Sequence, residues 1–260
     1  MNILIVGLGN FGTKYINLLN SQAEKDIYYN IYVLRHSKIK QINEDLLLSE
    51  YNIKKFYYSL DDIKSLKFDC VIITNPSTFH VEIANYFINK KVSCLIEKPL
   101  SNSYEKSLKL INNNCYVQIG YLLRYSSMYQ YLKNYNKFIG KLLLVKINVG
   151  QYLPDWRKND YKDSVSSKND LGGGVLLELS HDINYLLGFL DIESYSIKSF
   201  VGKISDLDID VEDYCFFVMD LILKSNEKVV ASINLDMVDK DSNRTCKLIG
   251  EDGSMYLDFI

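Results

Sequence analysis

Two side chains in this sequence have the chemistry to act on a hydroxyl or carbonyl group, and Lys98 is the first. It lies in Glu97-Lys98-Pro99, directly after the apolar residues 92–96, so an amine and a rigid turn follow a predicted strand. In an open parallel sheet, ligands bind at the carboxyl ends of the strands, and an ammonium group there would stabilise a developing alkoxide. Taken alone, the tripeptide is more typical of a solvent-exposed strand exit.

His181 is the second candidate, because removal of a hydride from an alcohol carbon requires a base whose pKa lies near neutrality. It follows the glycines at 172–174 in a segment that predicts one long helix over residues 172–190. The helical spacing places an apolar stripe on one face and a polar group on the opposite face, namely Glu178, His181, Asp182 and Tyr185. A single helix histidine is more often structural, so this assignment needs support from the rest of the chain.

The beginning of the chain predicts a dinucleotide-binding turn. Apolar residues 3–6 lead into Gly7-Leu8-Gly9-Asn10-Phe11-Gly12, and a helical pattern follows. The first glycine permits a tight turn, the second lets the backbone approach a pyrophosphate, and the third lets helix and strand pack closely. The predicted contacts are Gly7, Gly9, Asn10, Phe11 and Gly12. A glycine turn without a ligand and an S-adenosylmethionine site would begin in the same way.

The residues after the second predicted strand bear on the choice of cofactor. An acidic residue there hydrogen-bonds the ribose hydroxyls of NAD, whereas basic residues accommodate the extra phosphate of NADP. Here the strand ends in Arg35-His36-Ser37-Lys38, without a carboxylate. We therefore expect NADP as the preferred cofactor and NAD as the alternative, with contacts from Arg35, His36 and Ser37. In the competing interpretation the basic residues are only solvated and Ser37 caps the next helix.

A third polar segment, residues 74–80, ends another predicted strand and begins a helix, so its polar groups face the same carboxyl edge. The cofactor contacts predicted in this part of the chain are Thr74, Asn75, Pro76, His80, Glu97 and Lys98. For His80, a structural role at the start of the helix is the alternative.

The order of apolar and amphipathic segments predicts an α/β protein of two domains. Residues 1–120 alternate between predicted strands (3–6, 27–34, 70–74, 92–96 and 116–119) and predicted helices (11–20, 37–50, 78–89 and 103–112). This alternation is typical of a Rossmann fold, a doubly wound parallel sheet that binds NAD or NADP. Residues 121–260 contain a predicted helix at 128–138 and β-rich segments at 142–149, 195–201, 214–223, 228–237 and 245–259. They predict an α+β domain with an open mixed or antiparallel sheet.

Charge and composition exclude several classes of partner. Thirty basic and 32 acidic residues give a formal net charge of −2, which argues against a broad nucleic-acid or membrane surface. The N-terminal residues lack the basic segment of a secretory signal. Five cysteines without CxxC spacing are typical of a reducing compartment, and the three histidines are not spaced as metal ligands. We expect a cytoplasmic protein without a metal.

Taken together, these motifs resemble the Gfo/Idh/MocA family of glucose-fructose oxidoreductase-like and inositol-dehydrogenase-like proteins. The resemblance covers nearly the whole chain and lies in residues 7–12, 74–80, 97–99, 120–125, 172–181 and 249–253. It implies an NAD- or NADP-dependent oxidoreductase acting on a sugar, cyclitol or sugar derivative, as in carbohydrate or surface-sugar metabolism, and a possible homo-oligomer. The lysine matching Lys98 would contact the substrate hydroxyl, and the histidine matching His181 would be the acid-base catalyst. The expected substrate contacts are Lys98, Arg124, Trp156, Arg157 and Asn184.

The sequence departs from the family pattern in three places. The carboxylate before His181 is Glu178, three residues away, where many members have Asp four residues away. Asn184 stands three residues after His181, where Asp is common. The chain also ends at Ile260, inside a predicted strand, where members usually continue, so we expect a short C-terminal domain. These departures favour one alternative, a catalytically inactive, cofactor-binding regulatory or scaffold protein of the same fold.

Overall fold

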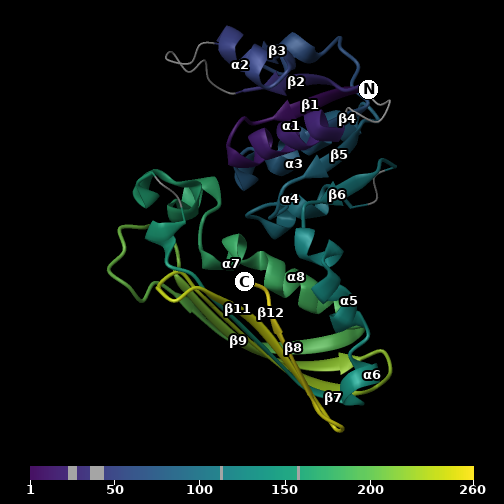
Figure 1. Cartoon of the computed structure of the whole chain (residues 1–260), viewed down its shortest axis with the longest axis vertical. Helices are drawn as coiled ribbons and strands as arrows, with labels where there is room; N and C mark the ends of the chain where they lie inside the picture. Colours follow the sequence, from purple (N-terminus) through teal and green to yellow (C-terminus); the bar gives the residue numbers. More distant parts are fainter. Residues whose placement is uncertain (23–27, 36–43, 112–113, 157–158) are drawn as a thin grey trace. The chain divides into compact units, whose positions relative to one another are not determined.

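The computed structural model describes residues 1–22, 28–35, 44–111, 114–156 and 159–260. The chain forms two compact units, Met1–Gly120 and Tyr121–Ile260 (Figure 1), and each is described by itself. Among the described residues, no helix has the length and apolar character needed to cross a bilayer.

The N-terminal unit is built on one parallel sheet of six strands in the order β3-β2-β1-β4-β5-β6. The strands are β1 (Asn2–Val6), β2 (Asn30–Leu34), β3 (Ile53–Tyr57), β4 (Cys70–Ile73), β5 (Ser93–Ile96) and β6 (Val117–Ile119). The helices are α1 (Asn10–Gln22), α2 (Glu44–Glu50), α3 (His80–Ile88) and α4 (Tyr104–Leu108), with 3-10 turns η1 (Asp61–Ile63) and η2 (Ser77–Phe79). Central strands such as β1 and β4 are almost continuously buried, as expected for a sheet covered on both faces. The predicted doubly wound fold is confirmed.

The strand order reverses between β1 and β4, which makes this the switch point where ligands bind in such sheets. Val6 pairs with Ile73, and Ile73 pairs with Ile96, so β1, β4 and β5 end at the same level. The loops that follow these three strands are therefore neighbours at one edge of the sheet, although 67 residues separate Gly7 from Thr74 in the sequence.

Strand β3 at the edge of the sheet was absent from the sequence-based prediction. Its residues run Ile53-Lys54-Lys55-Phe56-Tyr57, with the two lysines exposed and the other three side chains buried. This pattern is neither an alternation nor a continuous apolar segment, and those are the two patterns by which strands are recognised. An exposed edge tolerates the lysines because only one neighbouring strand pairs with β3.

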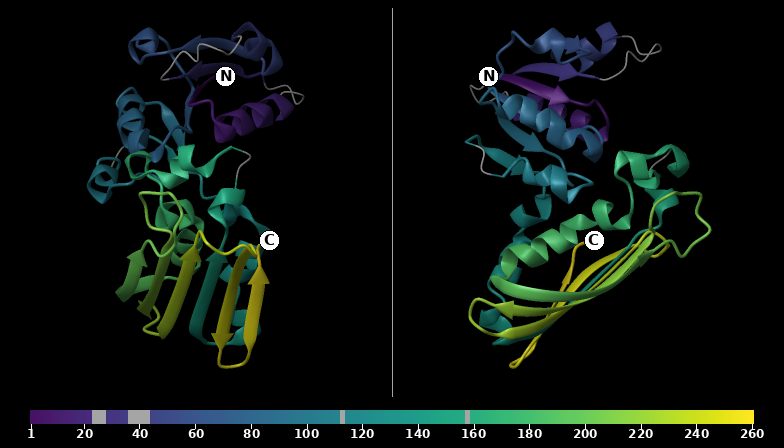
Figure 2. Two further views of the ribbon diagram at one scale, coloured as in Figure 1. Left: turned by 90° about the vertical axis from the view of Figure 1, so that its left-hand side faces the viewer. Right: turned by 180° about the vertical axis from the view of Figure 1, so that it is seen from behind.

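The C-terminal unit contains a second six-stranded sheet in the order β12-β11-β7-β10-β9-β8. Its strands are β7 (Leu142–Gly150), β8 (Ile192–Gly202), β9 (Tyr214–Leu223), β10 (Lys228–Asp236), β11 (Asn243–Gly250) and β12 (Ser254–Asp258). The pair β7 and β10 is parallel and the other pairs are antiparallel, so the predicted mixed sheet is confirmed. In Figure 2, helices α7 (Val175–Glu178) and α8 (Ser180–Phe189) lie along one face of this sheet.

Shorter elements complete this unit. They are α5 (Ser127–Lys133), α6 (Asn136–Ile139) and the 3-10 turns η3 (Leu122–Tyr125), η4 (Leu153–Asp155), η5 (Tyr161–Asp163), η6 (Val165–Ser167) and η7 (Asn169–Leu171). The core under the helices combines alternate residues of the strands, such as Val145 and Ile147 of β7, with Leu179 and Leu186.

The prediction of one long helix over residues 172–190 was wrong. Helix α7 ends at Glu178, and α8 begins at Ser180 after Leu179, whose backbone leaves the helical region (φ −95°, ψ 19°). This break changes the rotational phase of the residues that follow. Asp182 and Tyr185, which were predicted on the polar face opposite the apolar stripe, are both buried, at 0% and 1% exposure.

Candidate functional site

The turn after β5 carries Lys98 at the carboxyl edge of the parallel sheet. Glu97 continues the strand pairing, since its N–H donates to the carbonyl of Ile73 at 2.9 Å. The Lys98-Pro99 peptide bond is cis. Lys98 is half-buried, and its backbone directly follows β5, the strand that pairs with β4 at this edge of the sheet.

In the glycine turn after β1, two glycines are tightly packed and the third is open. A Cβ atom built on Gly7 (φ +94°) would lie 2.9 Å from the backbone nitrogen of Asn75, and one on Gly12 would lie 2.2 Å from the carbonyl oxygen of Gly7. A Cβ atom on Gly9 would meet no described atom within 4 Å. The first and third glycines are thus required by packing, whereas the second faces open space at the start of α1, where helix N–H groups attract anions. Asn10 and Phe11 in this first turn are both exposed.

The loop after β4 brings further polar groups to the same edge. The Thr74 hydroxyl lies 2.9 Å from the carbonyl oxygen of Gly7 and 3.1 Å from that of Val6, which joins this loop to the glycine turn. Asn75 Oδ1, Ser77 Oγ and Thr78 Oγ1 are buried without a hydrogen-bond partner among the described residues. Buried polar atoms normally have partners. The residues at this edge therefore fit a polar ligand such as a dinucleotide.

His80, predicted as a cofactor contact, has a different environment. Its imidazole is 1% exposed, with Nε2 at 2.6 Å from the carbonyl oxygen of Asn75 and Nδ1 at 2.9 Å from that of Pro99. Burial lowers the pKa of His80, and the hydrogen bonds to the two backbone carbonyls oppose that shift. Both ring nitrogens are engaged by the protein, so the cofactor assignment is corrected to a structural one. His80 joins the loop after β4 to the Lys98-Pro99 turn.

The Glu97 carboxylate, also predicted to contact the cofactor, is buried at 5% exposure and bound within the protein. Tyr15 Oη donates to Oε1 at 2.6 Å, and the N–H of Lys98 donates to Oε2 at 3.2 Å. Burial raises the pKa of Glu97, while the hydrogen bond from Tyr15 and the charge of Lys98 oppose the shift. A Cβ atom on Gly120 would approach this carboxylate to 3.0 Å, so a larger residue there would press on the carboxylate. Neither Tyr15 nor the packing role of Gly120 was predicted.

Of the residues predicted to select NADP, Arg35 lies directly after β2, and its N–H donates to the carbonyl of Tyr57 at 2.9 Å. It is 8% exposed, and its guanidinium lies over the ring of Phe56, 5.7 Å from the centroid. The packing positions a cation at the end of this strand. His36, Ser37 and Arg157 lie outside the described residues.

In the C-terminal unit, His181 lies on the first turn of α8. Tyr121 packs edge-on against its imidazole, with centroids 5.7 Å apart and an interplanar angle of 84°. Glu178 accepts a hydrogen bond from Ser166 at 2.9 Å, and Asp182 forms an ion pair with Arg244 at 3.4 Å. Each of the two carboxylates nearest to His181 in the sequence therefore has a contact within this unit.

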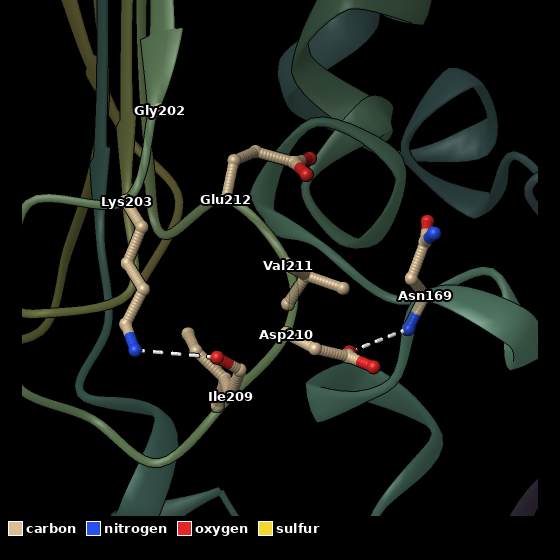
Figure 3. A pocket seen from close by; sticks show the side chains of 7 residues that line it. All are labelled: Asn169, Gly202, Lys203, Ile209, Asp210, Val211 and Glu212. Carbon is tan, nitrogen blue, oxygen red and sulfur yellow. Dashed lines mark hydrogen bonds between the residues drawn. The ribbon is translucent and has the colours of Figure 1, made fainter.

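The glycines before His181 are also set by packing. Gly174 has φ +103°, and a Cβ atom there would lie 2.4 Å from the Glu212 carboxylate. Glu212 Oε1 accepts from the N–H of Leu176 at 3.1 Å, so this side chain caps the start of α7. Glu212 also borders a hollow of about 450 Å³, shown in Figure 3. In the hollow, Lys203 donates to the carbonyl of Ile209, and Asp210 accepts from the N–H of Asn169. Both charged side chains therefore hydrogen-bond to backbone groups of the surrounding loops.

Two residues predicted to contact the substrate bind each other instead. Arg124 Nε donates to Asn184 Oδ1 at 2.6 Å, and Nη2 donates to the carbonyl of Asn184 at 2.9 Å. The guanidinium also fills the space beside Gly188, where a Cβ atom would lie 2.7 Å from Cζ. Trp156 is half-buried and packs against the core of this unit. Arg124 is therefore a structural partner of α8, and the amide nitrogen of Asn184 is not used in this pair.

Two sequence profiles of one family match the chain. The profile described as "Oxidoreductase family, NAD-binding Rossmann fold" matches residues 1–114, and the family's C-terminal domain profile matches residues 135–256. The chain belongs to the Gfo/Idh/MocA family. The expected family is confirmed, and with it an NAD-binding oxidoreductase fold.

Solved structures with the same fold come from sugar and cyclitol dehydrogenases. One is the WlbA dehydrogenase from Bordetella pertussis in complex with NADH and UDP-GlcNAcA, with 18% identity, a TM-score of 0.81, and coverage of 99% of this chain and 79% of that one. Another is myo-inositol 2-dehydrogenase from Lactobacillus plantarum, with 18% identity, a TM-score of 0.78, and coverage of 99% and 76%. GenD2 from gentamicin A biosynthesis, in complex with NAD, has 18% identity, a TM-score of 0.77, and coverage of 99% and 72%. Comparison of the sequence with curated proteins gives no match.

Proposed function

We propose that this Gfo/Idh/MocA protein transfers a hydride between a nicotinamide cofactor and a carbinol or carbonyl carbon of a sugar derivative. The observation that supports it most is the position of Lys98. This half-buried residue follows β5 at the sheet edge that also carries the open glycine turn and the oxygens of Asn75, Ser77 and Thr78, which have no hydrogen-bond partner among the described residues. A cation, an anion-binding helix start and polar groups at one sheet edge suit an anionic cofactor and an alkoxide.

The proposed chemistry assigns one task to each of two side chains. The cofactor supplies the hydride-accepting or hydride-donating carbon. In the oxidation direction, the imidazole of His181 takes the hydroxyl proton while the ammonium group of Lys98 stabilises the oxygen as it becomes a carbonyl. In the reduction direction, His181 returns that proton. The carbinol loses a hydride from carbon and a proton from oxygen, so a neutral carbonyl group remains and charge and atoms balance.

Replacement of each residue by alanine tests these roles. We expect Lys98→Ala to lower kcat about 10²- to 10³-fold, and His181→Ala about 10²- to 10⁴-fold, with the Kd for the reduced cofactor changed little. Lys106→Ala, at an exposed position of α4, is the matched control and should retain activity. Full turnover in both variants would refute the assignment. Cofactor binding without turnover on any sugar would instead support the inactive regulatory protein.

For the cofactor we propose a preference for NADP over NAD, supported by the cation of Arg35 at the end of β2. Fluorescence titration should give a lower Kd for NADPH than for NADH. Arg35→Met, which keeps an apolar contact with Phe56, should weaken NADPH binding about tenfold and leave NADH binding nearly unchanged. An equal loss for both cofactors would mean that Arg35 only packs against Phe56.

For the substrate we propose a nucleotide sugar or a cyclitol. The support comes from the family and from two structural neighbours. One is named as a dehydrogenase in complex with NADH and UDP-GlcNAcA, and the other as a myo-inositol 2-dehydrogenase. A panel of UDP-sugars, UDP-sugar acids and inositols, assayed with both oxidised cofactors at 340 nm, distinguishes the two classes. Turnover of neither class would reject the proposed substrates.

A further inference from the structure

The Glu97 carboxylate connects two parts of the N-terminal unit that are distant in sequence. One oxygen accepts from the hydroxyl of Tyr15 at 2.6 Å, across a separation of 82 residues, and the other accepts from the N–H of Lys98 at 3.2 Å. Tyr15 lies on α1, three residues after Gly12. The carboxylate therefore bridges the helix that begins at the glycine turn and the backbone of the residue with the amine.

The surroundings of this carboxylate leave it little freedom to move. Glu97 is 5% exposed, its N–H is paired with the carbonyl of Ile73, and Gly120 lies against the carboxylate, where a Cβ atom would approach an oxygen to 3.0 Å. A buried carboxylate is costly unless donors satisfy it. Loss of the hydrogen bond from Tyr15 would therefore shift the carboxylate and weaken the hydrogen bond between its other oxygen and the N–H of Lys98.

The bridge requires an ionised Glu97 and a protonated Tyr15. Burial and the neighbouring carboxylate raise the pKa of Tyr15, so its hydroxyl remains a donor. Burial raises the pKa of Glu97, whereas Tyr15, the N–H and charge of Lys98, and the charge of Lys14 lower it. These are the groups that face Glu97 from α1 and from its own turn. The bridge is a charge-assisted hydrogen-bond pair, the stronger class of hydrogen bond.

We infer that Tyr15 is a positioning residue which, through Glu97, fixes the turn of Lys98 relative to the cofactor-binding start of α1. This inference rests on the proposed hydride-transfer function for its kinetic consequences. The hydroxyl of Tyr15 does not touch substrate or cofactor in this role. It sets the place of the Lys98 backbone, and a misplacement of a catalytic group by about 1 Å can cost 10²-fold in rate.

Tyr15→Phe is the direct test because it removes one oxygen and keeps the ring. We expect kcat to fall about 10- to 100-fold while the Kd for NADPH stays within about twofold. The acid limb of the kcat profile should also move to higher pH, because loss of the donor raises the pKa of Glu97 further. Tyr104→Phe, at an exposed position of α4, is the matched control and should match the wild type.

A double-mutant cycle with Glu97→Gln separates this role from general destabilisation. If Tyr15 acts through Glu97, Tyr15→Phe should have little further effect on kcat in the Glu97→Gln background. Independent effects, in which the two losses multiply, would overturn the inference. So would a wild-type kcat and pH profile in Tyr15→Phe.

A measurement that does not depend on turnover tests the positioning role separately from the proposed function. Trinitrobenzenesulfonate labelling, followed peptide by peptide, reports the reactivity of the Lys98 amine in each variant. We expect the rate at Lys98 to change about threefold or more in Tyr15→Phe, because the surroundings of its amine change, with exposed Lys106 unchanged. If the wild type turned over no sugar but this change were seen, the function would fail and the positioning role would stand. Unchanged labelling at Lys98 would refute the positioning role, whatever the wild-type activity.

Discussion

Arg124 donates two hydrogen bonds to Asn184, one to the side-chain oxygen at 2.6 Å and one to the backbone carbonyl at 2.9 Å. Arginine only donates, so this contact determines which end of the amide faces it. The oxygen of the Asn184 amide accepts from Arg124, and the amide nitrogen, a donor, points away from it.

Replacement of Asn184 should show how much this pair stabilises α8. We expect Asn184→Ala to lower the free energy of unfolding by about 1–3 kcal/mol, because the half-buried guanidinium loses a partner. Asn184→Asp should retain or raise it, since the carboxylate restores an acceptor with charge. Urea unfolding followed by circular dichroism measures both, with Lys247→Ala on β11 as the exposed control. Equal stability of all three variants would show that the pair contributes nothing.

The ion pair between Asp182 and Arg244 predicts that a second substitution restores part of the stability lost in the first. Asp182 is fully buried and the Arg244 side chain is 17% exposed, with 3.4 Å between Oδ2 and Nε. Arg244→Met should lower the free energy of unfolding by about 3–5 kcal/mol, because a buried carboxylate loses its counter-charge. Adding Asp182→Asn should recover part of this loss by removing the charge. If the double variant were less stable than Arg244→Met, the electrostatic explanation would be wrong.

The buried His80 predicts a loss of stability in acid. Burial lowers its pKa from 6.5, so between the folded and unfolded pKa values the unfolded chain binds more protons. Stability from this group is present above about pH 6.5 and is lost as the pH falls below it. We therefore expect unfolding free energies at pH 7, 6 and 5 to fall more steeply for the wild type than for His80→Gln. Parallel slopes for the two proteins would contradict the prediction.

In the turn after β1, we expect substitution of one glycine to lower stability and substitution of another to weaken cofactor binding. Gly12→Ala should destabilise the protein by about 1–3 kcal/mol, since its methyl group would meet the carbonyl of Gly7 at 2.2 Å. Gly9→Ala should fold normally, because the position is open, yet raise the Kd for NADPH about tenfold or more by blocking close approach of the phosphates. Thermal unfolding and fluorescence titration give the two quantities. Unchanged NADPH binding in Gly9→Ala would remove this glycine from the cofactor site.

The sequence by itself determined the features that depend on neighbouring residues. Runs of buried apolar residues end at Val6, Ile73 and Ile96, and this local pattern placed the glycine turn, the Thr74 loop and Lys98 at strand ends. In a parallel sheet all such ends face one edge, so the fold class and the region of the candidate site followed from the pattern. The edge strand β3 was not predicted because its exposed lysines interrupt the apolar periodicity.

The tertiary structure decided which side chains meet. The bond between Tyr15 and Glu97, the burial of His80 against two carbonyls, and the pairing of Arg124 with Asn184 join residues up to 82 positions apart. The break at Leu179 likewise turned Asp182 and Tyr185 toward the sheet. Spacing along a helix or strand constrains only the residues within that element. Contacts between elements depend on strand order, register and helix phase, which are set by packing of the whole unit.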